Sequence, residues 1–322
     1  MVQIPLSFTL ASPEPEWQTT PPPRRTDQSF VTAKVIDGIA IARKVRIGIR
    51  ARAQALVDEH GIRPGLAVIM AGDNPASAVY VRNKVRACGE VGIHSEVLRF
   101  PATVTESELL ACIRELNETP TIHGILVQLP IPPAVSVRRV LETISVDKDV
   151  DGFHLYNVGG LVIGNTVFPP CTPYGVQKIL EHEGITLEGK NVTVVGASNI
   201  VGKPMALMLM QHEATVAICH AKTRDLAQYT ILADIVVVAA GHPRLIVPQM
   251  IRTGAVVIDV GINRLADGTL VGDVDFDGVR KKASHITPVP GGVGPMTVTM
   301  LLDNTVAAAE RAVKNEKVRV YG

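Results

Sequence analysis

The sequence predicts an α/β protein with two domains, each built on a parallel sheet. Short apolar runs alternate with segments of helical spacing along most of the 322 residues, and a stretch rich in Gly, Pro and Asn at 152–175 interrupts this alternation. Val, Ala, Ile and Gly are abundant, which suits buried parallel strands joined by tight turns. Such alternation places helices on both faces of a parallel sheet, and the chain is long enough for two cores.

The interruption at 152–175 separates the two expected domains. We expect residues 33–152 to form the first domain and 153–295 the second. The C-terminal segment 296–316 has helical spacing and three consecutive alanines, and we expect it to return to the first domain. Residues 1–32 contain three consecutive prolines and no basic region before a short apolar patch. We interpret them as a disordered extension and not as a secretory signal.

Charge and aromatic content exclude two classes of partner. The chain has 32 basic and 31 acidic residues, for a net charge of +1, so it lacks the positive footprint of a nucleic-acid binder. Aromatic residues make up 4%, which leaves few rings for bases to stack on. The longest uncharged run, 152–177, is broken by several glycines and prolines. We therefore expect no nucleic-acid partner and no membrane span.

The cysteines indicate a reducing compartment. Cys88, Cys112, Cys171 and Cys219 lie far apart and form no C-x-x-C pair. A disulfide framework or a zinc cluster is therefore not expected. We predict reduced thiols, a cytoplasmic location and no metal site.

Periodicity locates the individual elements. Apolar residues recur at helical spacing from Ile41 to Val57, and Gly61 ends this helix. The first half then continues with strand 66–70, helix 76–91, strand 96–99, helix 106–116, strand 124–129 and helix 137–144. The second half contains expected strands at 191–195, 215–219, 235–239 and 256–260, with helices between them.

A glycine-rich turn follows the expected strand at 191–195. It reads Gly196-Ala197-Ser198-Asn199-Ile200-Val201-Gly202, and a helix is expected to begin just after it. Backbone N–H groups and the dipole of such a helix favour a bound pyrophosphate. The spacing G-x-S-x-x-x-G departs from the common G-x-G-x-x-G dinucleotide fingerprint. An ordinary strand–helix turn therefore remains an alternative.

The end of the next strand indicates which dinucleotide would bind. An NAD site usually places Asp or Glu roughly 20 residues after the glycine turn. Here the corresponding segment, 220–224, reads His-Ala-Lys-Thr-Arg. These cations suit a 2′-phosphate and favour NADP, although a solvated basic loop is the alternative interpretation. Two further glycine turns, 239–241 and 259–263, follow later strands at the edge where open α/β sheets bind ligands.

Polar residues of the first half form a second candidate group. Tyr80 and Lys84 are four residues apart, which places both on one face of a helix. Gln128 stands at the carboxyl end of an expected strand, and Asp151 belongs to an Asp-Gly pair. Each has a simpler explanation: a surface helix with an extended lysine, a polar strand end, or a plain turn.

These residues belong to a set of longer motifs that occur in order along the chain. The motifs are Tyr80-Val-x-x-Lys84, Gln128-Leu-Pro130, Lys148-Asp-Val-Asp-Gly-Phe153, Pro170-Cys-Thr-Pro173, Gly196-Ala-Ser-x-x-x-Gly202-Lys-Pro204, Val260-Gly-Ile-Asn263, and Thr287-Pro-Val-Pro-Gly-Gly-Val-Gly-Pro-Met-Thr297. Together they resemble the bifunctional methylenetetrahydrofolate dehydrogenase/cyclohydrolase family, from about Val35 to Lys314. The resemblance implies a Rossmann-like NADP-binding second domain that faces the catalytic first domain across a cleft.

The resemblance also implies two reactions in one pocket. The family oxidises 5,10-methylenetetrahydrofolate with NADP⁺ and hydrolyses the 5,10-methenyl product to 10-formyltetrahydrofolate. Lys84 matches the catalytic lysine, which we expect to be buried, and Gln128 matches the residue that holds it. Asp151 matches the anchor of the pterin ring, and Tyr80 would stack on the aminobenzoate ring. Tetrahydrofolate derivatives are the expected partners, and a homodimer is the usual assembly.

The remaining family positions would line the two ligands. Pro290, Gly291 and Gly292 would form a backbone wall beside the substrate. The cofactor-binding positions implied by the resemblance are Gly196, Ala197, Ser198, Ile200, Gly202, His220, Ala221, Lys222, Gly241, Gly261, Ile262 and Thr297.

Three positions depart from the family pattern. Many members have Arg at the position of Ala197 and others have Ser at Ala221, and both contact the 2′-phosphate. Lys222 and Arg224 are the substitutes that this chain offers. Gly160 replaces a frequent Arg.

Two alternatives to this assignment stay open on the sequence. One is another two-domain dehydrogenase of the shikimate or amino-acid type, and the other is a non-catalytic NADP-binding protein.

Overall fold

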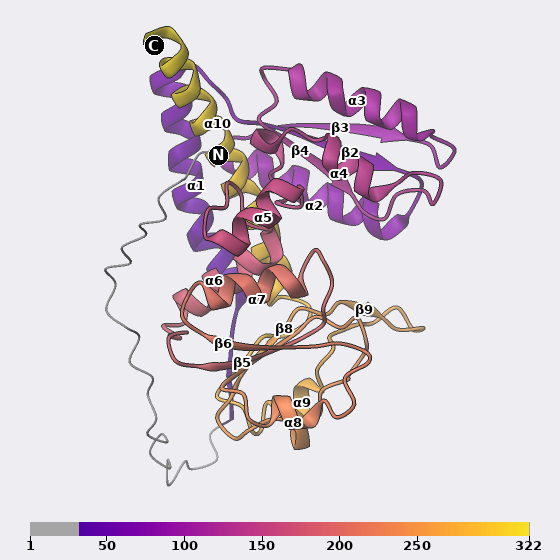
Figure 1. Cartoon of the computed structure of the whole chain (residues 1–322), viewed down its shortest axis with the longest axis vertical. Helices are drawn as coiled ribbons and strands as arrows, with labels where there is room; N and C mark the ends of the chain where they lie inside the picture. Colours follow the sequence, from indigo (N-terminus) through magenta and orange to yellow (C-terminus); the bar gives the residue numbers. More distant parts are fainter. Residues whose placement is uncertain (1–31, 322) are drawn as a thin grey trace, which may run out of the picture.

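The computed structural model describes residues 32–321, without the side chains of 75, 76 and 315–321. Two α/β domains lie one above the other in Figure 1, and the long helices α1 (Gly38–His60) and α10 (Val293–Tyr321) run side by side along one side of the molecule. All but the last residue of the expected extension 1–32 lies outside the described part of the chain.

The first domain contains a three-stranded parallel sheet in the order β3-β2-β4. Its elements after α1 are β2 (Gly65–Ala71), α2 (Pro75–Val91), β3 (His94–Phe100), α3 (Glu106–Glu118), β4 (Gly124–Gln128), α4 (Val137–Thr143) and the 3-10 helix η1 (Val146–Lys148). The central strand β2 is buried along its whole length. Leu66, Val68 and Met70 face the core shared with α1 and α10, whereas Ala67 and Ile69 face the core under α3. This period of two explains why β2 reads as a continuous apolar run.

The second domain contains a six-stranded parallel sheet in the order β1-β11-β8-β7-β5-β6. Its elements are β1 (Lys34–Val35), β5 (Asn191–Val195), α7 (Gly202–Met210), β6 (Thr215–Cys219), α8 (Ala227–Thr230), β7 (Ile235–Val238), the 3-10 helix η2 (Pro248–Met250), β8 (Val256–Asp259), β9 (Asn263–Arg264), β10 (Leu270–Val271), α9 (Phe276–Val279) and β11 (His285–Ile286). Strands β9 and β10 form a separate antiparallel pair. The expected α/β class with parallel sheets is confirmed.

The chain crosses between the second sheet and the first domain at two places, after β1 and after β11. Strands β1 and β11 are adjacent and parallel, and each is followed by a long helix, α1 or α10. The two crossings touch where α1 begins, since a Cβ on Gly38 would overlap the carbonyl oxygen of Gly292. The first described strand, β1, therefore belongs to the second sheet, although residues 33–152 were expected in the first domain. A two-residue strand is too short to show a periodic pattern.

The segment 152–175 contains helices that its composition did not indicate. Helix α5 (Leu155–Ile163) ends at Gly164, where φ is +74°, and α6 (Cys171–His182) packs against α7 and α10. The structure also explains Gly160. A Cβ there would lie 2.5 Å from the Asn165 carbonyl oxygen, so the turn that closes α5 leaves no room for a side chain.

No helix of the described residues is both long enough and apolar enough to cross a membrane.

The contact between Gly38 and Gly292 generates a prediction about stability. The substitution Gly38→Ala should lower the free energy of unfolding by about 1–3 kcal/mol, because the new methyl group meets rigid backbone. Gly48 lies in the same helix with open space around its Cα, so Gly48→Ala should raise that free energy by about 0.5–1 kcal/mol. Chemical denaturation of both variants measures the difference. Equal shifts in the two variants would contradict the close contact.

Candidate active site

Lys84 and Gln128 meet at the carboxyl end of the first sheet. Strand β4 lies on the opposite side of β2 from β3, so its end is at the point where strand order reverses, which is where open sheets bind ligands. Gln128 is the last residue of β4, and its Oε1 accepts a hydrogen bond from Lys84 Nζ at 3.0 Å. Gln128 Nε2 donates to the Leu129 carbonyl at 2.7 Å. The amide is thereby oriented with its oxygen toward the lysine.

The expectation that Lys84 is buried is wrong. Lys84 is half-buried, and Arg82 and Arg86 on the same helix are exposed. The hydrogen bond to Gln128, and not burial, therefore holds its ammonium group. Tyr80, one turn earlier on α2, is 40% exposed, which leaves its ring available to a ligand.

Asp151 adds a carboxyl group to this site. Its loss of hydration raises its pKa to about 6, and the nearby positive charge of Lys84 partly opposes that rise. The Cys171 thiol beside it donates to the Val150 carbonyl at 3.3 Å. Burial raises the pKa of Cys171 well above its ordinary value. This thiol therefore stays protonated and contributes to packing.

The backbone on both sides of Asp151 is held by buried polar side chains that sequence reasoning missed. Asp149, 1% exposed, accepts hydrogen bonds from the N–H groups of Phe153 and His154 and from Asn157 Nδ2. From α10, Asn304 donates to the Val150 carbonyl at 2.9 Å. No local pattern could reveal Asn304, because it acts on a segment more than a hundred residues away in the chain. Together these bonds fix the loop that carries Asp151.

Pro290, Gly291 and Gly292 lie where the second sheet gives way to α10. Gly291 has φ of +104°, and a Cβ on Gly292 would lie 2.6 Å from the Pro288 carbonyl oxygen. Both positions therefore favour glycine. The backbone of this loop lies against Gly38 at the start of α1, and its role as a wall beside the substrate stays a prediction.

The glycine turn 196–202 lies at the reversal of strand order in the second sheet. Strand β5 is flanked by β6 on one side and β7 on the other, so the turns that follow β5 and β7 are neighbours. A Cβ on Gly196, which has φ of +123°, would overlap the Ala239 carbonyl oxygen, and one on Gly202 would overlap the Gly196 carbonyl oxygen. This crowded backbone requires glycine at both positions.

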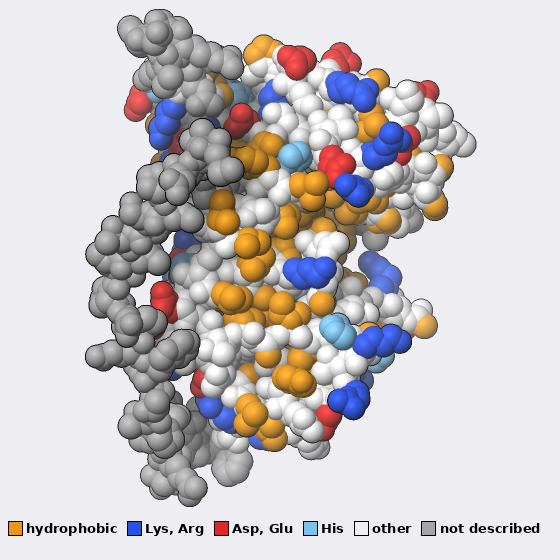
Figure 2. Space-filling model, in the orientation of Figure 1, with side chains coloured by type: hydrophobic (Ala, Val, Ile, Leu, Met, Phe, Trp, Pro, Cys, Tyr) orange, Lys and Arg blue, Asp and Glu red, His pale blue; other side chains and the backbone are white. Residues whose placement is uncertain are grey.

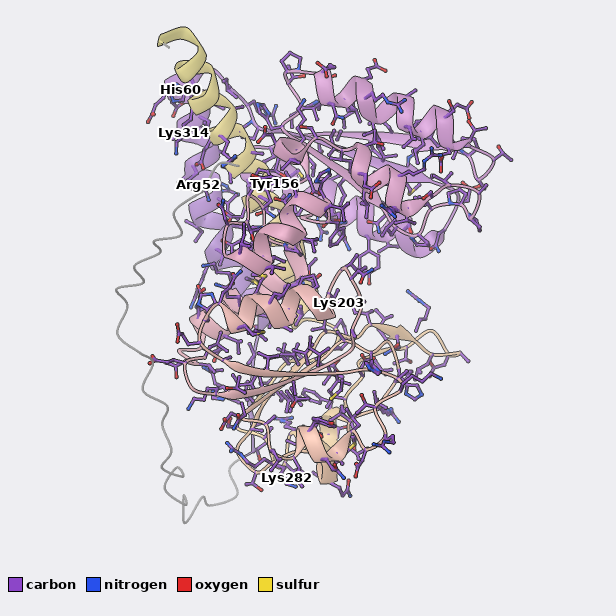
Figure 3. The ribbon with its side chains drawn as sticks, viewed as in Figure 1. Arg52, His60, Tyr156, Lys203, Lys282 and Lys314 are labelled. Carbon is purple, nitrogen blue, oxygen red and sulfur yellow. The ribbon has the colours of Figure 1, made fainter. Side chains whose placement is uncertain are left out.

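Ser198 lies in the glycine turn just before α7 begins. Its Oγ accepts hydrogen bonds from the N–H groups of Val201 at 3.1 Å and Gly202 at 3.3 Å. Ala197 is half-buried, and Ile200 is 37% exposed beside the turn. Lys203 extends from the first turn of α7 between the two domains (Figure 3) and donates to Asn199 Oδ1 at 2.7 Å. At the N-terminus of α7, Ser198 thus accepts hydrogen bonds from the N–H groups of Val201 and Gly202, and Lys203 adds one exposed cation.

The basic segment after β6 forms a compact turn. His220 Nδ1 accepts from the Lys222 N–H at 3.1 Å, and Thr223 Oγ1 accepts from the His220 N–H at 3.0 Å. The turn borders a polar cavity of about 450 Å³. That cavity is lined by Ile218, His220, Lys222, Thr223, Arg224, Asp225, Gln228 and Tyr229. Ala221 is exposed but is not among the lining residues.

The remaining expected cofactor positions lie near the same edge of the second sheet. Gly241 follows β7 with φ of +67°, and Gly261 and Ile262 follow β8, with Ile262 45% exposed. Thr297 lies in the first turns of α10, and its hydroxyl is 3.1 Å from that of Thr172 at the start of α6. Figure 2 shows the molecule hollowed between the domains on its right side, with Lys, Arg and His side chains gathered on the lower domain beside the hollow.

These features define the class of protein: a two-domain α/β fold with glycine turns of the dinucleotide-binding type in one domain and a Lys–Gln–Asp cluster in the other. Comparisons with known proteins identify the family. The catalytic-domain model of tetrahydrofolate dehydrogenase/cyclohydrolase matches residues 36–151, and the NAD(P)-binding-domain model matches residues 170–313. The chain belongs to the tetrahydrofolate dehydrogenase/cyclohydrolase family, as its motifs indicated.

Individual relatives agree over nearly their full length. A bifunctional protein FolD of Nitrosospira multiformis is 61% identical over 88% of this chain and 98% of its own, and one of Bordetella petrii is 60% identical over 87% and 95%. The solved FolD of Campylobacter jejuni is 51% identical, with a TM-score of 0.85 over 87% of this chain and 99% of its own. The Trypanosoma brucei enzyme, solved with NADP cofactor and an inhibitor, is 41% identical, with a TM-score of 0.85 over 88% and 99%. Family membership excludes the shikimate- or amino-acid-type alternative.

Proposed function

We propose that this chain oxidises 5,10-methylenetetrahydrofolate with NADP⁺ and hydrolyses the 5,10-methenyl product, with both reactions in one pocket between the domains. The observation that carries the proposal is the hydrogen-bonded pair Lys84–Gln128 at the carboxyl end of the first sheet, in a chain whose second sheet has glycine turns of the dinucleotide-binding type. Membership of the tetrahydrofolate dehydrogenase/cyclohydrolase family supports both activities.

The residues present fit NADP. The turns at Gly196 and Gly202 let a pyrophosphate approach backbone at the start of α7. The cavity after β6 offers Lys222 and Arg224 to a 2′-phosphate, in place of arginine at 197 and serine at 221. When bound, NADP⁺ supplies the hydride acceptor for the oxidation of the methylene carbon.

Lys84 and Gln128 would perform the proton transfers. Gln128 holds the Lys84 ammonium group at the edge of the cleft, so the lysine does not turn away into solvent. In the hydrolysis, Lys84 would exchange a proton with the folate nitrogen that leaves the one-carbon bridge, while water adds to the methenyl carbon. A positioned acid–base group of this kind contributes about 10²–10⁴ to a rate.

Asp151 and Tyr80 would hold the substrate. The ionised Asp151 carboxylate can accept paired hydrogen bonds from the amino-pyrimidine edge of the pterin. Tyr80 would place its exposed ring against the aminobenzoate group. The backbone at Pro290, Gly291 and Gly292 would close the remaining side.

We also propose a homodimer in the cytoplasm. Exposed apolar side chains on α5 and α7 support self-association, among them Leu155, Val162, Ile163 and Met210, which are 55–76% exposed. Figure 2 shows hydrophobic side chains in a band across the middle of this face. The four cysteines, all free thiols, suit a reducing compartment.

The role of Lys84 predicts a selective loss of hydrolysis. Lys84→Met should lower cyclohydrolase kcat by about 100-fold or more and leave the Kd for NADP⁺ within about twofold. Arg82→Met changes an exposed cation on the same helix and should leave both quantities unchanged. Hydrolysis of the methenyl substrate and calorimetric titration with NADP⁺ measure the two effects. Wild-type hydrolysis by the Lys84 variant would contradict the assigned role.

The basic segment predicts cofactor selectivity. Neutralising both cations, as Lys222→Gln with Arg224→Gln, should raise KM for NADP⁺ by about 10- to 100-fold, because two charge-assisted hydrogen bonds to the 2′-phosphate are lost. KM for NAD⁺ should change by less than about twofold. Lys190→Gln, at the opposite end of β5, is the matched control. An equal rise in KM for both dinucleotides would contradict recognition of the 2′-phosphate.

A further inference from the structure

Two buried aspartates lie beneath the turns at the edge of the second sheet. Asp259 is the last residue of β8, Asp273 follows β10, and their side chains are 3% and 0% exposed. None of the site assignments above uses either residue. Carboxylates buried this deeply lose hydration, which is costly unless several donors replace the water.

Asp273 joins two turns that are separate in the chain. Its Oδ2 accepts hydrogen bonds from the N–H groups of Ala240 at 2.7 Å and Gly241 at 2.9 Å, in the turn after β7. Its Oδ1 accepts from Asn263 Nδ2 at 2.8 Å, in the segment after β8. Gly261 packs so tightly on this carboxylate that a Cβ would overlap it. One side chain therefore sets the spacing between the two turns.

Asp259 holds Asp273 in place. Its Oδ1 accepts from the N–H groups of Gly261 and Asp273, each at 3.0 Å, and its Oδ2 accepts from the Val274 N–H at 3.0 Å. Its own N–H donates to Thr287 Oγ1 at 2.7 Å. Burial raises the pKa of Asp259 to about 7, and the N–H donors oppose that rise. The two side chains form one continuous network.

The network needs two acceptor oxygens on each side chain and not merely a polar group. Each of the four carboxylate oxygens accepts at least one hydrogen bond from a backbone or amide N–H. An asparagine in place of either aspartate would point an NH₂ group at one set of these donors. Both oxygens of the side chain are in use, so no rotation of that amide avoids the conflict.

We propose that Asp273, braced by Asp259, is a positioning residue for the dehydrogenase reaction alone. The inference rests on the proposed function, in which Gly241, Gly261 and Ile262 border NADP. Asp273 holds the backbone of the turns after β7 and β8, which carry these three residues. Removing its carboxylate therefore shifts the backbone against which the dinucleotide would lie.

The cyclohydrolase reaction should not depend on this network. Lys84 and Gln128 belong to α2 and β4, and Asp151 is held by Asp149 and Asn304. Among the described residues, the hydrogen bonds of these groups stay within the first domain, its connecting loop and α10. Hydrolysis of the methenyl substrate also consumes no dinucleotide.

The test separates the two activities in one variant. Asp273→Asn should raise KM for NADP⁺ by about tenfold or more. Cyclohydrolase kcat and KM, measured on methenyltetrahydrofolate without added nucleotide, should stay within about twofold of wild type. Asp275→Asn is a matched control two residues along the chain, because Asp275 caps α9 and Asn is an equally good cap. It should change neither activity.

Each other outcome is decisive. A parallel fall in both activities of Asp273→Asn would overturn the proposal in favour of a general structural role, and so would unchanged KM for NADP⁺. If Asp273→Asn does not fold, Asn263→Ala removes one donor to Asp273, and it should raise KM for NADP⁺ by about threefold or more with hydrolysis unchanged. Absence of that split would overturn the proposal. Wild-type protein without either activity would instead refute the proposed function.

Discussion

The rest of the structure depends on the close contact between two chain crossings at Gly38 and Gly292. Strands β1 and β11 leave the second sheet side by side, and each leads into a long helix of the first domain. Because Gly38 has no Cβ, the start of α1 can lie against the backbone of Gly291 and Gly292 in the loop before α10. The two helices then pack along their length and carry the first sheet (Figure 1). The relative position of the two sheets, and so the width of the cleft, follows from this contact.

Within that cleft, recognition is local. The numbers of basic and acidic residues are almost equal, so no overall field draws in the anionic ligands. In the proposed function, particular groups serve instead: the α7 N-terminus with Lys203, the cations around the cavity after β6, and the Lys84 ammonium group held by Gln128. In both domains, buried carboxylates accept hydrogen bonds that hold the loops of the candidate site. Asp149 shapes the loop of Asp151, and Asp273 joins the turns after β7 and β8.

Long elements could be predicted from the sequence, and short or tertiary ones could not. Strands such as β2 and β5 are continuous apolar runs, so their positions were predicted to within a few residues. Strands β1 and β11 have two residues each, and only their pairing with neighbouring strands, β1 with β11 and β11 with β8, defines them. Helix α5 was missed because Gly159 and Gly160 resemble a loop. In the structure Gly160 is a site of close backbone approach.

The candidate site divides in the same way. Lys84, Gln128 and Asp151 were found because motifs carry them, and the first two do meet. The expectation that Lys84 is buried was wrong, because helical spacing does not show how deeply each side chain of a helix is buried. Asp273 and Asn304 went unrecognised, since each acts on segments far away in the chain. Their significance is visible only in three dimensions.

The central claim is that one pocket between the domains performs both reactions. The most direct test mixes the wild-type protein with 5,10-methylenetetrahydrofolate and NADP⁺, and follows reduced nicotinamide and the methenyl chromophore together. The account predicts that reduced nicotinamide accumulates while the methenyl compound stays well below it, as 10-formyltetrahydrofolate forms. No reduction of NADP⁺, or a methenyl compound that accumulates mole for mole with reduced nicotinamide at the uncatalysed rate of hydrolysis, would contradict it.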